Sequence, residues 1–136
     1  MFTQEIPGEV PREVPRSEWA DFCDSFSRQH RGGLATIEMA RPGAAPQTIA
    51  DELPLRGLTL NSKSHEADTL LVTLGQHGDE RLTHAITQVV RLCFDVTEAG
   101  AQAGLTFESA DGTITRLRFR VPVFPEMVDG VMLFDE

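Results

Sequence analysis

The stretch that most restricts the fold lies near the C-terminal end of the chain. In residues 114–121, ITRLRFRV, arginines and apolar residues alternate: Arg116, Arg118 and Arg120 stand between Leu117, Phe119 and Val121. Successive side chains of a β-strand point to opposite faces, so this period of two predicts a strand with one apolar and one charged face. Such a strand needs neighbouring strands and a core on one side, which commits this part of the chain to a sheet.

The residues before this strand predict a β-hairpin. Asp111 and Gly112 form a turn signal between the segments LTFES and TITRLRFRV. A two-residue loop would set Phe107 opposite Arg116 and mix the two faces. A loop made of residues 110–112 keeps the apolar face apolar, and we expect a type I turn with Gly112 in the left-handed conformation. The pairs that follow are Leu105 with Leu117, Thr106 with Arg116 and Phe107 with Thr115.

Most of the remaining chain after residue 33 also has the pattern of strands. Alternation or short apolar runs mark residues 34–39, 47–61, 68–75 and 82–97. Pro54 and Gly57 interrupt the second of these segments, which indicates an edge strand, a bulge or a sharp bend. In the last segment, the alternation predicts an inward-facing side made of Val90, Leu92, Phe94 and Val96. Arg91, Cys93 and Asp95 are then expected on the other side.

One helix is expected, over residues 17–31. Ser17 is a candidate N-cap, and Gly32-Gly33 gives a stop signal after the helix. An apolar stripe at helical spacing consists of Trp19, Phe22, Cys23 and Phe26. The ordinary role of such a stripe is to pack on a sheet, so Cys23 is interpreted as a small core residue.

Together these elements predict an α+β fold, with one N-terminal amphipathic helix packed on a curved antiparallel sheet or small β-barrel of about six strands. Residues 17–136 are expected to form a single domain. Residues 1–16, with three prolines, are expected to be an extended arm that is disordered or lies along a sheet edge or a partner. The predicted core contains Trp19, Phe22, Phe26, Leu92, Phe94, Phe107, Leu117 and Phe119.

Charge and cysteine content limit the classes of function. The net charge is −9, which disfavours nucleic acid as a partner because an acidic chain repels phosphates at long range. No secretory signal and no apolar run near the roughly 18 residues of a membrane span is present. We therefore expect a cytoplasmic protein without a membrane partner. Cys23 and Cys93 are expected to be reduced there, and a disulfide between them is the alternative.

Four blocks of the sequence resemble a known family. They are EVPRSEW, LTHAI, ESADGTITRLRFR and PEMVDGV, and the resemblance runs from about Glu13 to Val131. The family is one of small bacterial proteins known only as a domain of unknown function. The resemblance implies a bacterial, soluble, single-domain protein, and it brings no activity, ligand or catalytic residue.

The first candidate site is the arginine row, which we define as Arg116, Arg118 and Arg120. On one strand face the three side chains are spaced by about 7 Å. The simplest interpretation is a solvated face with acidic neighbours, for which Glu108 and Asp95 are the expected partners. The alternatives are a contact surface for a protein partner or a second copy, and a site for a phosphorylated ligand or nucleic acid. Against nucleic acid, Phe119 points to the other face, so the row lacks a stacking platform.

The second candidate is a metal site in the segment HGDERLTHA. Its imidazoles and carboxylates, which belong to His77, Asp79, Glu80 and His84, are suitable ligands for zinc or another divalent ion. Their spacing fits no standard ligand pattern, and a polar connecting loop is the simpler interpretation. A Cys93 nucleophile activated by Arg91 is a further alternative, although no histidine lies near it in the sequence.

No catalytic residues or cofactors are predicted, since no nucleophile elbow, phosphate-binding loop or dinucleotide fingerprint occurs. The sequence predicts a non-catalytic binding or protein-interaction module, with a homodimer or another protein as partner. The proline-containing arm and the apolar, acidic C-terminal tail favour this hypothesis. A metal-dependent protein or enzyme using residues 77–84 is the alternative, and nucleotide or nucleic-acid binding by the arginine row is a weaker one.

Overall fold

The computed structural model describes residues 9–61, 68–75, 81–97 and 101–123 of the chain. Its elements, in chain order, are β1 (Glu9–Glu13), the 3-10 helix η1 (Arg16–Glu18), α1 (Trp19–His30), β2 (Leu34–Ala40), β3 (Gln47–Asn61), β4 (Asp68–Leu74), β5 (Leu82–Thr97), β6 (Gln102–Ser109) and β7 (Ile114–Val123). Within the described ranges, no helix is long and apolar enough to cross a membrane.

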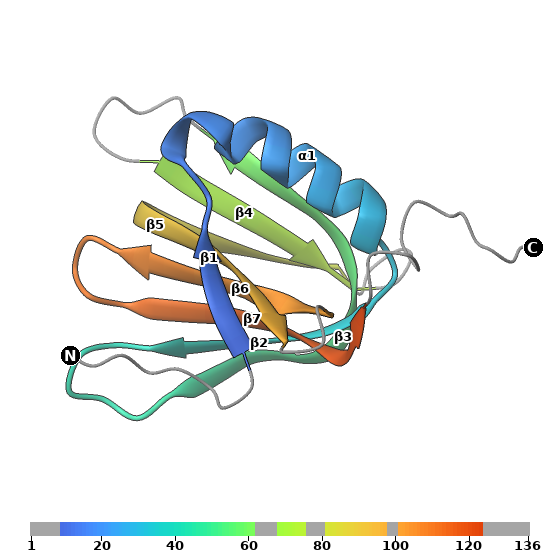
Figure 1. Ribbon diagram of the computed structural model, residues 1–136. Helices are drawn as coiled ribbons and strands as arrows, with labels where there is room; N and C mark the ends of the chain where they lie inside the picture. Colours follow the sequence, from blue (N-terminus) through green and yellow to red (C-terminus); the bar gives the residue numbers. More distant parts are fainter. Residues whose placement is uncertain (1–8, 62–67, 76–80, 98–100, 124–136) are drawn as a thin grey trace, which may run out of the picture.

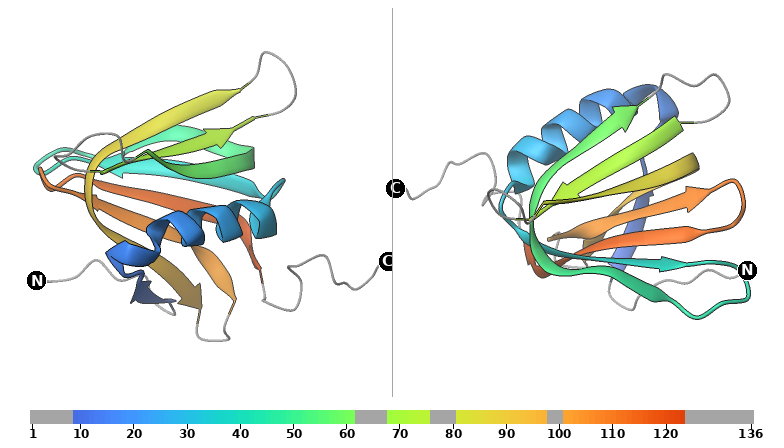
Figure 2. Two further views of the ribbon diagram at one scale, coloured as in Figure 1. Left: turned by 90° about the horizontal axis from the view of Figure 1, so that it is seen from above. Right: turned by 180° about the vertical axis from the view of Figure 1, so that it is seen from behind.

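The strands form one antiparallel sheet that closes into a barrel (Figure 1). Six strands follow the order β5-β4-β3-β2-β7-β6, and pairing between β6 and β5 closes the ring. β1 lies outside the ring as an extra strand on β5. The helix α1 packs along β3, across one side of the barrel (Figure 2). The predicted fold, one N-terminal helix on a small antiparallel barrel of about six strands, is confirmed.

Two long strands, β3 and β5, allow this closure because each changes its partner along its length. β3 pairs with β2 as far as Pro54 and with β4 from Leu55 onward. β5 pairs with β4 as far as Val89, and with β6 from Val89 onward. Near these changes Glu52 and Gln88 adopt left-handed backbone angles, with φ of 53° and 54°. Bulges of this kind bend a strand and increase its twist, as a small barrel requires.

The bulge in β5 overturns one prediction from the alternation. Val90, expected inward, is 58% exposed, and Val89 is buried instead. The register with β6 shifts between Val89 and Arg91, and an extra residue in a strand moves its neighbours to the other face. Beyond the bulge the predicted alternation holds, since Leu92 and Val96 are buried.

The C-terminal hairpin has the register that the sequence predicts. Its pairs are Leu105 with Leu117, Thr106 with Arg116 and Phe107 with Thr115. Gly112 has a φ of 92° in the turn. The Thr113 amide donates to the Asp111 carboxylate at 2.9 Å, and this local hydrogen bond explains why aspartate suits the turn.

The helix begins later than predicted. Ser17 is not its N-cap, because it lies in η1, where the Glu18 amide donates to the Pro15 carbonyl at 2.8 Å. α1 therefore begins at Trp19, without a side-chain cap. At the other end, Gly32 has a φ of 91° and ends the helix as the sequence predicts.

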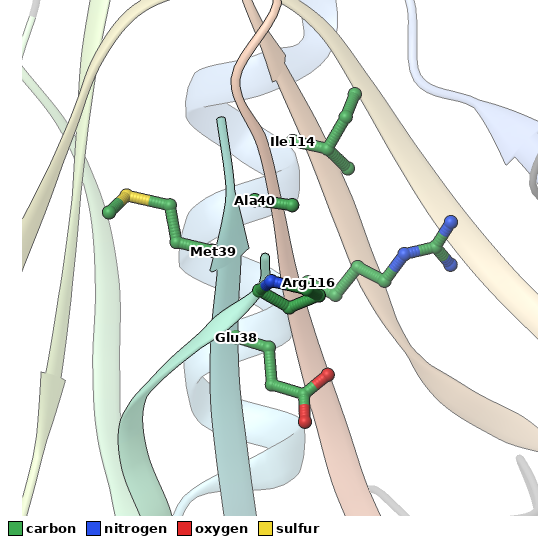
Figure 3. Close-up of a pocket in the computed structure, with 6 residues that line it drawn as sticks. Glu38, Met39, Ala40, Ile114 and Arg116 are labelled. Atoms are coloured by element: carbon green, nitrogen blue, oxygen red, sulfur yellow. The ribbon is translucent and has the colours of Figure 1, made fainter. Parts of the chain in front are cut away.

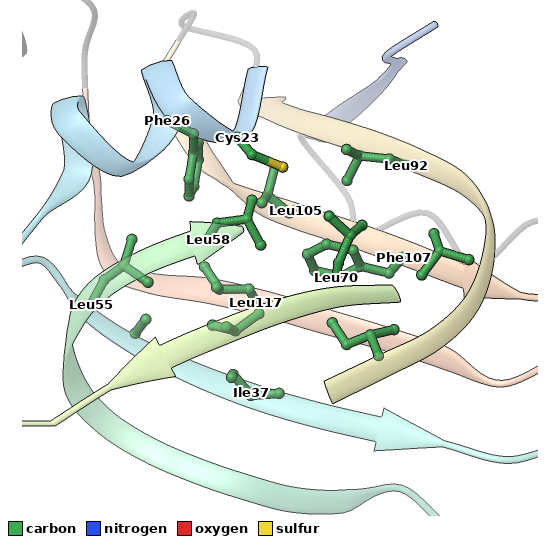
Figure 4. Close-up of a cluster of buried hydrophobic side chains, with 14 of the residues drawn as sticks. Cys23, Phe26, Ile37, Leu55, Leu58, Leu70, Leu92, Leu105, Phe107 and Leu117 are labelled. Carbon is green, nitrogen blue, oxygen red and sulfur yellow. The ribbon is translucent and has the colours of Figure 1, made fainter. Parts of the chain in front are cut away.

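The interior of the barrel is filled by side chains from the helix and from the inward faces of the strands (Figure 4). Among the predicted core residues, Trp19, Phe26, Leu92, Phe107, Leu117 and Phe119 are buried. Phe22 and Phe94 are partly buried and pack against this cluster, with their ring centroids 5.6 Å apart. The helix thus covers the core with the stripe that the sequence singles out.

The described part of the N-terminal arm lies along a sheet edge. β1 pairs with the C-terminal half of β5, from Glu9 opposite Thr97 to Glu13 opposite Cys93. Immediately after β1, Val14 is buried, and its carbonyl accepts a hydrogen bond of 2.9 Å from the Trp19 indole. The arm and the helix are therefore tied together over the same side of the barrel.

Candidate functional site

The arginine row lies on the outer face of β7, as its alternation predicts. The intervening residues Thr115, Leu117 and Phe119 are buried, whereas Arg120 is exposed. β7 pairs with β2 on one side and with β6 on the other. The chemistry of the row is therefore decided by the outward residues of those strands and of β5 beyond β6.

Arg118 forms an ion pair with Asp95 across an intervening strand. Its Nη1 atom lies 3.3 Å from Asp95 Oδ2, although β6 separates β7 from β5. Gly104 stands opposite both residues in the sheet registers. Because glycine has no side chain, the arginine can extend over β6 to the carboxylate.

This ion pair is largely removed from solvent. The Asp95 side chain is 5% exposed and the Arg118 side chain 20% exposed. The Thr106 hydroxyl also donates to Asp95 Oδ2, at 2.8 Å. A buried carboxylate requires such partners, so Arg118 serves the fold and is not a freely available cation.

A second set of charges lies on the same face, around Arg91 of β5. Its Nη1 atom lies 2.8 Å from Glu108 Oε2 on β6, and its Nε atom lies 3.4 Å from Glu13 Oε1 on β1. The hydrogen bond to Glu108 raises the pKa of Arg91. Glu108, the expected partner of the arginine row, thus pairs with Arg91 among the described contacts.

The two remaining arginines of the row are Arg120 and Arg116. Arg120 Nη1 lies 3.8 Å from Glu52 Oε1, and both side chains are exposed. Arg116 is opposite Glu38 in the sheet, but its guanidinium is directed away from the Glu38 carboxylate (Figure 3).

A shallow depression beside Arg116 is lined by Glu38, Met39, Ala40, Pro46, Ile114 and Arg116, and its volume is about 270 Å³ including open solvent. Ligand pockets commonly start at about 300 Å³ of enclosed space. An open hollow of this size is therefore a poor site for a small molecule.

The outer face as a whole carries mixed charge. Around the arginine row it includes the arginines Arg91, Arg116, Arg118 and Arg120 and the carboxylates Glu13, Glu38, Glu52, Asp95 and Glu108. Strong phosphate-backbone binding needs an excess of cations. This face has no such excess.

The candidate metal ligands are only partly within the described residues. His77, Asp79 and Glu80 lie outside them. His84 is on β5 opposite Val72 of β4, half-buried, and burial lowers the pKa of its imidazole. Within the described ranges, no group of three or more His, Cys, Asp or Glu side chains is arranged to hold a metal ion.

Both cysteines are free thiols buried in the protein, so the alternative of a Cys23–Cys93 disulfide is not realised. Burial raises the pKa of Cys23 to about 12, and the nearby Asp24 carboxylate adds to the shift. Burial also raises the pKa of Cys93, and the opposing effect of Arg91 is smaller. This environment does not support activation of Cys93 by Arg91, because a nucleophilic thiolate requires a lowered pKa.

His30 is a buried polar residue that the sequence analysis did not single out. It is 4% exposed, and its ring lies between Phe26 and Phe119 at centroid distances of 4.5 and 4.9 Å. Burial lowers the pKa of His30, and a weaker interaction with the Gln102 side chain opposes this shift. Among the described residues, the ring nitrogens have no partner with good hydrogen-bond geometry, so the neutral form is favoured.

Asp95 was predicted as a partner of the arginine row, and its ion pair with Arg118 confirms this prediction. The role of Gly104, which lets Arg118 extend over β6, was not predicted, although a glycine inside a strand is a signal for close approach. The pairing of Glu13 with Arg91 depends on the placement of β1, which prolines near a strand do not specify.

Comparison with known proteins identifies a family but no function. The model of a family of unknown function, DUF5335, matches residues 10–126. No curated protein and no solved structure gives a significant match. The matched range contains three of the four blocks on which the resemblance was based, including the complete C-terminal hairpin. Since the match covers most of the chain, this protein belongs to the DUF5335 family of unknown function.

Proposed function

We propose that this protein is a non-catalytic interaction module that binds other protein chains through its outer surface. The observation that carries the proposal is the filled interior of the barrel. Leu55, Leu70 and Leu92 are fully buried there together with aromatic residues. A barrel packed in this way leaves its outer faces and strand edges as the surfaces available for binding.

The mixed charge of the outer face supports a protein partner over a nucleic acid. Arg118 pairs with Asp95 and Arg91 pairs with Glu108, so two strong cations are already engaged by carboxylates. Protein interfaces tolerate such mixed charge, whereas nucleic-acid interfaces are strongly positive. We also propose a cytoplasmic location, which is supported by the two unpaired thiols.

Native mass spectrometry of the full-length chain, before and after treatment with a chelator, tests the proposed function. We expect masses that correspond only to protein chains, as single chains or as assemblies, and no change on chelation. A bound mass that the chelator removes would contradict the proposal and direct attention to His77 and His84. A co-purifying nucleotide or nucleic acid would contradict it in favour of the arginine row.

A further inference from the structure

The edges of the sheet differ in how well they are protected against pairing with another chain. An edge strand carries unpaired N–H and C=O groups, which natural proteins block with charges, prolines, bulges or covering elements. Although the barrel is closed, β3 and β5 change partners along their lengths. Each of these strands therefore has segments that are paired on only one side.

The exposed segments of β3 and β1 are protected. Residues 47–53 of β3 include Asp51 and Glu52, with a bulge at Glu52, where φ is 53°. Further along β3, the helix covers the edge, since the Ser27 hydroxyl accepts from the Leu58 amide at 2.8 Å. β1, Glu9–Glu13, carries a proline and charged residues.

Within the described ranges, the first half of β5 is less protected than these segments. Residues 82–87 pair with β4 on one side, and pairing with β6 starts only at Val89. The last contact on the β6 side is the hydrogen bond of 2.8 Å from the Ala110 amide to the Gln88 carbonyl. Within the described part of the chain, no strand pairs with the β6 side of residues 82–87.

The composition of this segment also leaves the edge open to a partner. The sequence LTHAIT, residues 82–87, contains no Asp, Glu, Lys, Arg or Pro. Its outward side chains are small: Thr83, Ala85 and Thr87 are exposed. Val90, just after the bulge, is the large apolar residue that the described surface exposes most, at 58%.

The uncharged and self-complementary sequence of this edge favours a second copy of this chain as its occupant. Two chains that each carry a net charge of −9 repel one another, so they can meet most easily where each surface is uncharged. Antiparallel pairing of residues 82–87 about Ala85 would place Thr83 of one copy opposite Thr87 of the other. Threonine pairs of this kind are favourable in antiparallel sheets.

We propose that two copies of this protein pair through the exposed edge of residues 82–87 in β5 and form a continuous antiparallel sheet across a two-fold axis. The proposal rests on the proposed function, because it names a partner and a surface for the interaction module. A two-strand contact buries little area, so the dimer is weak and forms in proportion to concentration.

Sedimentation velocity of the full chain over a series of concentrations tests this proposal with single lysine substitutions. Ala85→Lys and Thr87→Lys place a charge on the exposed side of the proposed contact, where lysine blocks edge pairing. Thr48→Lys is the matched control, since Thr48 is exposed on β3. All three substitutions reduce the net negative charge equally, so a general charge effect cannot produce a difference between them.

We expect a monomer–dimer equilibrium whose dissociation constant rises about tenfold or more in Ala85→Lys and Thr87→Lys, and stays unchanged in Thr48→Lys. Far-ultraviolet circular dichroism verifies that each variant is folded. If a variant does not fold, exchange of the wild-type amides in residues 82–87 at low and high protein concentration decides the question. Concentration-dependent protection supports the proposal, and its absence overturns it.

A monomer at every concentration, or a dimer that the lysine substitutions leave intact, also overturns the proposal. These results can be distinguished from a failure of the proposed function. A monomer that binds a different protein chain in native mass spectrometry leaves the interaction module in place. A chelator-sensitive metal contradicts the interaction module whatever the sedimentation result.

Discussion

At the scale of single residues, Gly104 decides whether the outer face can form. It is buried between Asp95 and Arg118 in the sheet registers, and its φ is 156°. A Cβ atom at this position would overlap the backbone carbonyl of Leu117. No flexible side chain can move away to relieve that overlap, so the strands β6 and β7 themselves would have to separate.

We predict that Gly104→Ala lowers the free energy of unfolding by about 3 kcal/mol or more. Gly57→Ala is the matched control, because its new methyl group would only approach the Ser27 hydroxyl, at 3.7 Å. Urea unfolding followed by circular dichroism measures both. Equal stability of the two variants would show that β6 and β7 are not packed as closely as described.

The buried ion pair gives a second prediction at this scale. Asp95→Asn removes the charge that Arg118 contacts at 3.3 Å, and it leaves a cation with 20% exposure without its described carboxylate. We expect a loss of about 2 kcal/mol in the free energy of unfolding, below the range for fully buried pairs because Arg118 is partly solvated. Arg120→Gln, in an exposed pair, should change it by less than about 0.5 kcal/mol. Chemical denaturation of the two variants makes the comparison.

Because His30 is buried, we expect the folded protein to lose stability in acid. Burial lowers its pKa in the folded protein, whereas the unfolded chain has an ordinary histidine pKa of about 6.5. The unfolded state therefore binds the proton more readily, so stability is full above that value and falls as the pH drops toward the folded pKa. His84, whose pKa is also lowered by burial, acts in the same direction.

We expect His30→Phe to reduce the loss of stability between neutral and mildly acidic pH, because the phenyl ring fits between Phe26 and Phe119 and does not titrate. Thermal unfolding of both proteins across this pH range measures the difference. An unchanged pH dependence would mean that His30 is solvated in the folded protein.

At the scale of elements, the sequence predicts best where local signals and the core agree. The register of the C-terminal hairpin follows from the Asp111-Gly112 turn and from the need to keep Leu117 on the apolar face. The inward face of β5 could be predicted only beyond Gln88, because the bulge there inserts a residue that no local pattern marks. The bend is required for closure of the barrel, and the sequence of a single strand does not indicate that closure.

The N-terminal arm shows the same limit of prediction from local sequence. Its prolines predict an extended conformation, but its pairing with β5 depends on the edge that β4 leaves uncovered beyond Val89. That edge exists only once the barrel has formed. The composition of residues 1–16 therefore left both disorder and sheet pairing open.

A further prediction concerns the protection of Cys93 by β1. Glu13 stands opposite Cys93 in the pairing of β1 with β5, and Cys93 is 3% exposed. We expect removal of residues 1–13 to make Cys93 react with a thiol reagent at least about tenfold faster, because local burial is what protects it. Cys23, on the buried face of α1, should remain slow, and the Cys93→Ser version of the shortened chain is the control. A fast reaction that persists in that control would assign the exposed thiol to Cys23.

At the scale of the whole molecule, the protein is a filled barrel whose outer face carries charges of both signs. The candidate site from sequence, the arginine row, lies on one strand face and has Asp95 as a partner, as predicted, but the burial of that ion pair and the pairing of Glu108 with Arg91 could not be predicted. The pairing of Arg118 with Asp95 joins strands that are not neighbours in the sheet. The exposed edge of β5 was equally hidden, because the sequence does not reveal where β6 ends along its partner.

The measurement that tests this account most directly is residue-resolved amide hydrogen exchange of the wild-type protein at low and high concentration. At low concentration, amides of residues 82–87 that face away from β4 should exchange quickly, and those that face β4 slowly. At high concentration, the first group should become protected while residues 47–53 stay unchanged. Fast exchange of that first group at every concentration would contradict the claim that copies of this chain meet at β5.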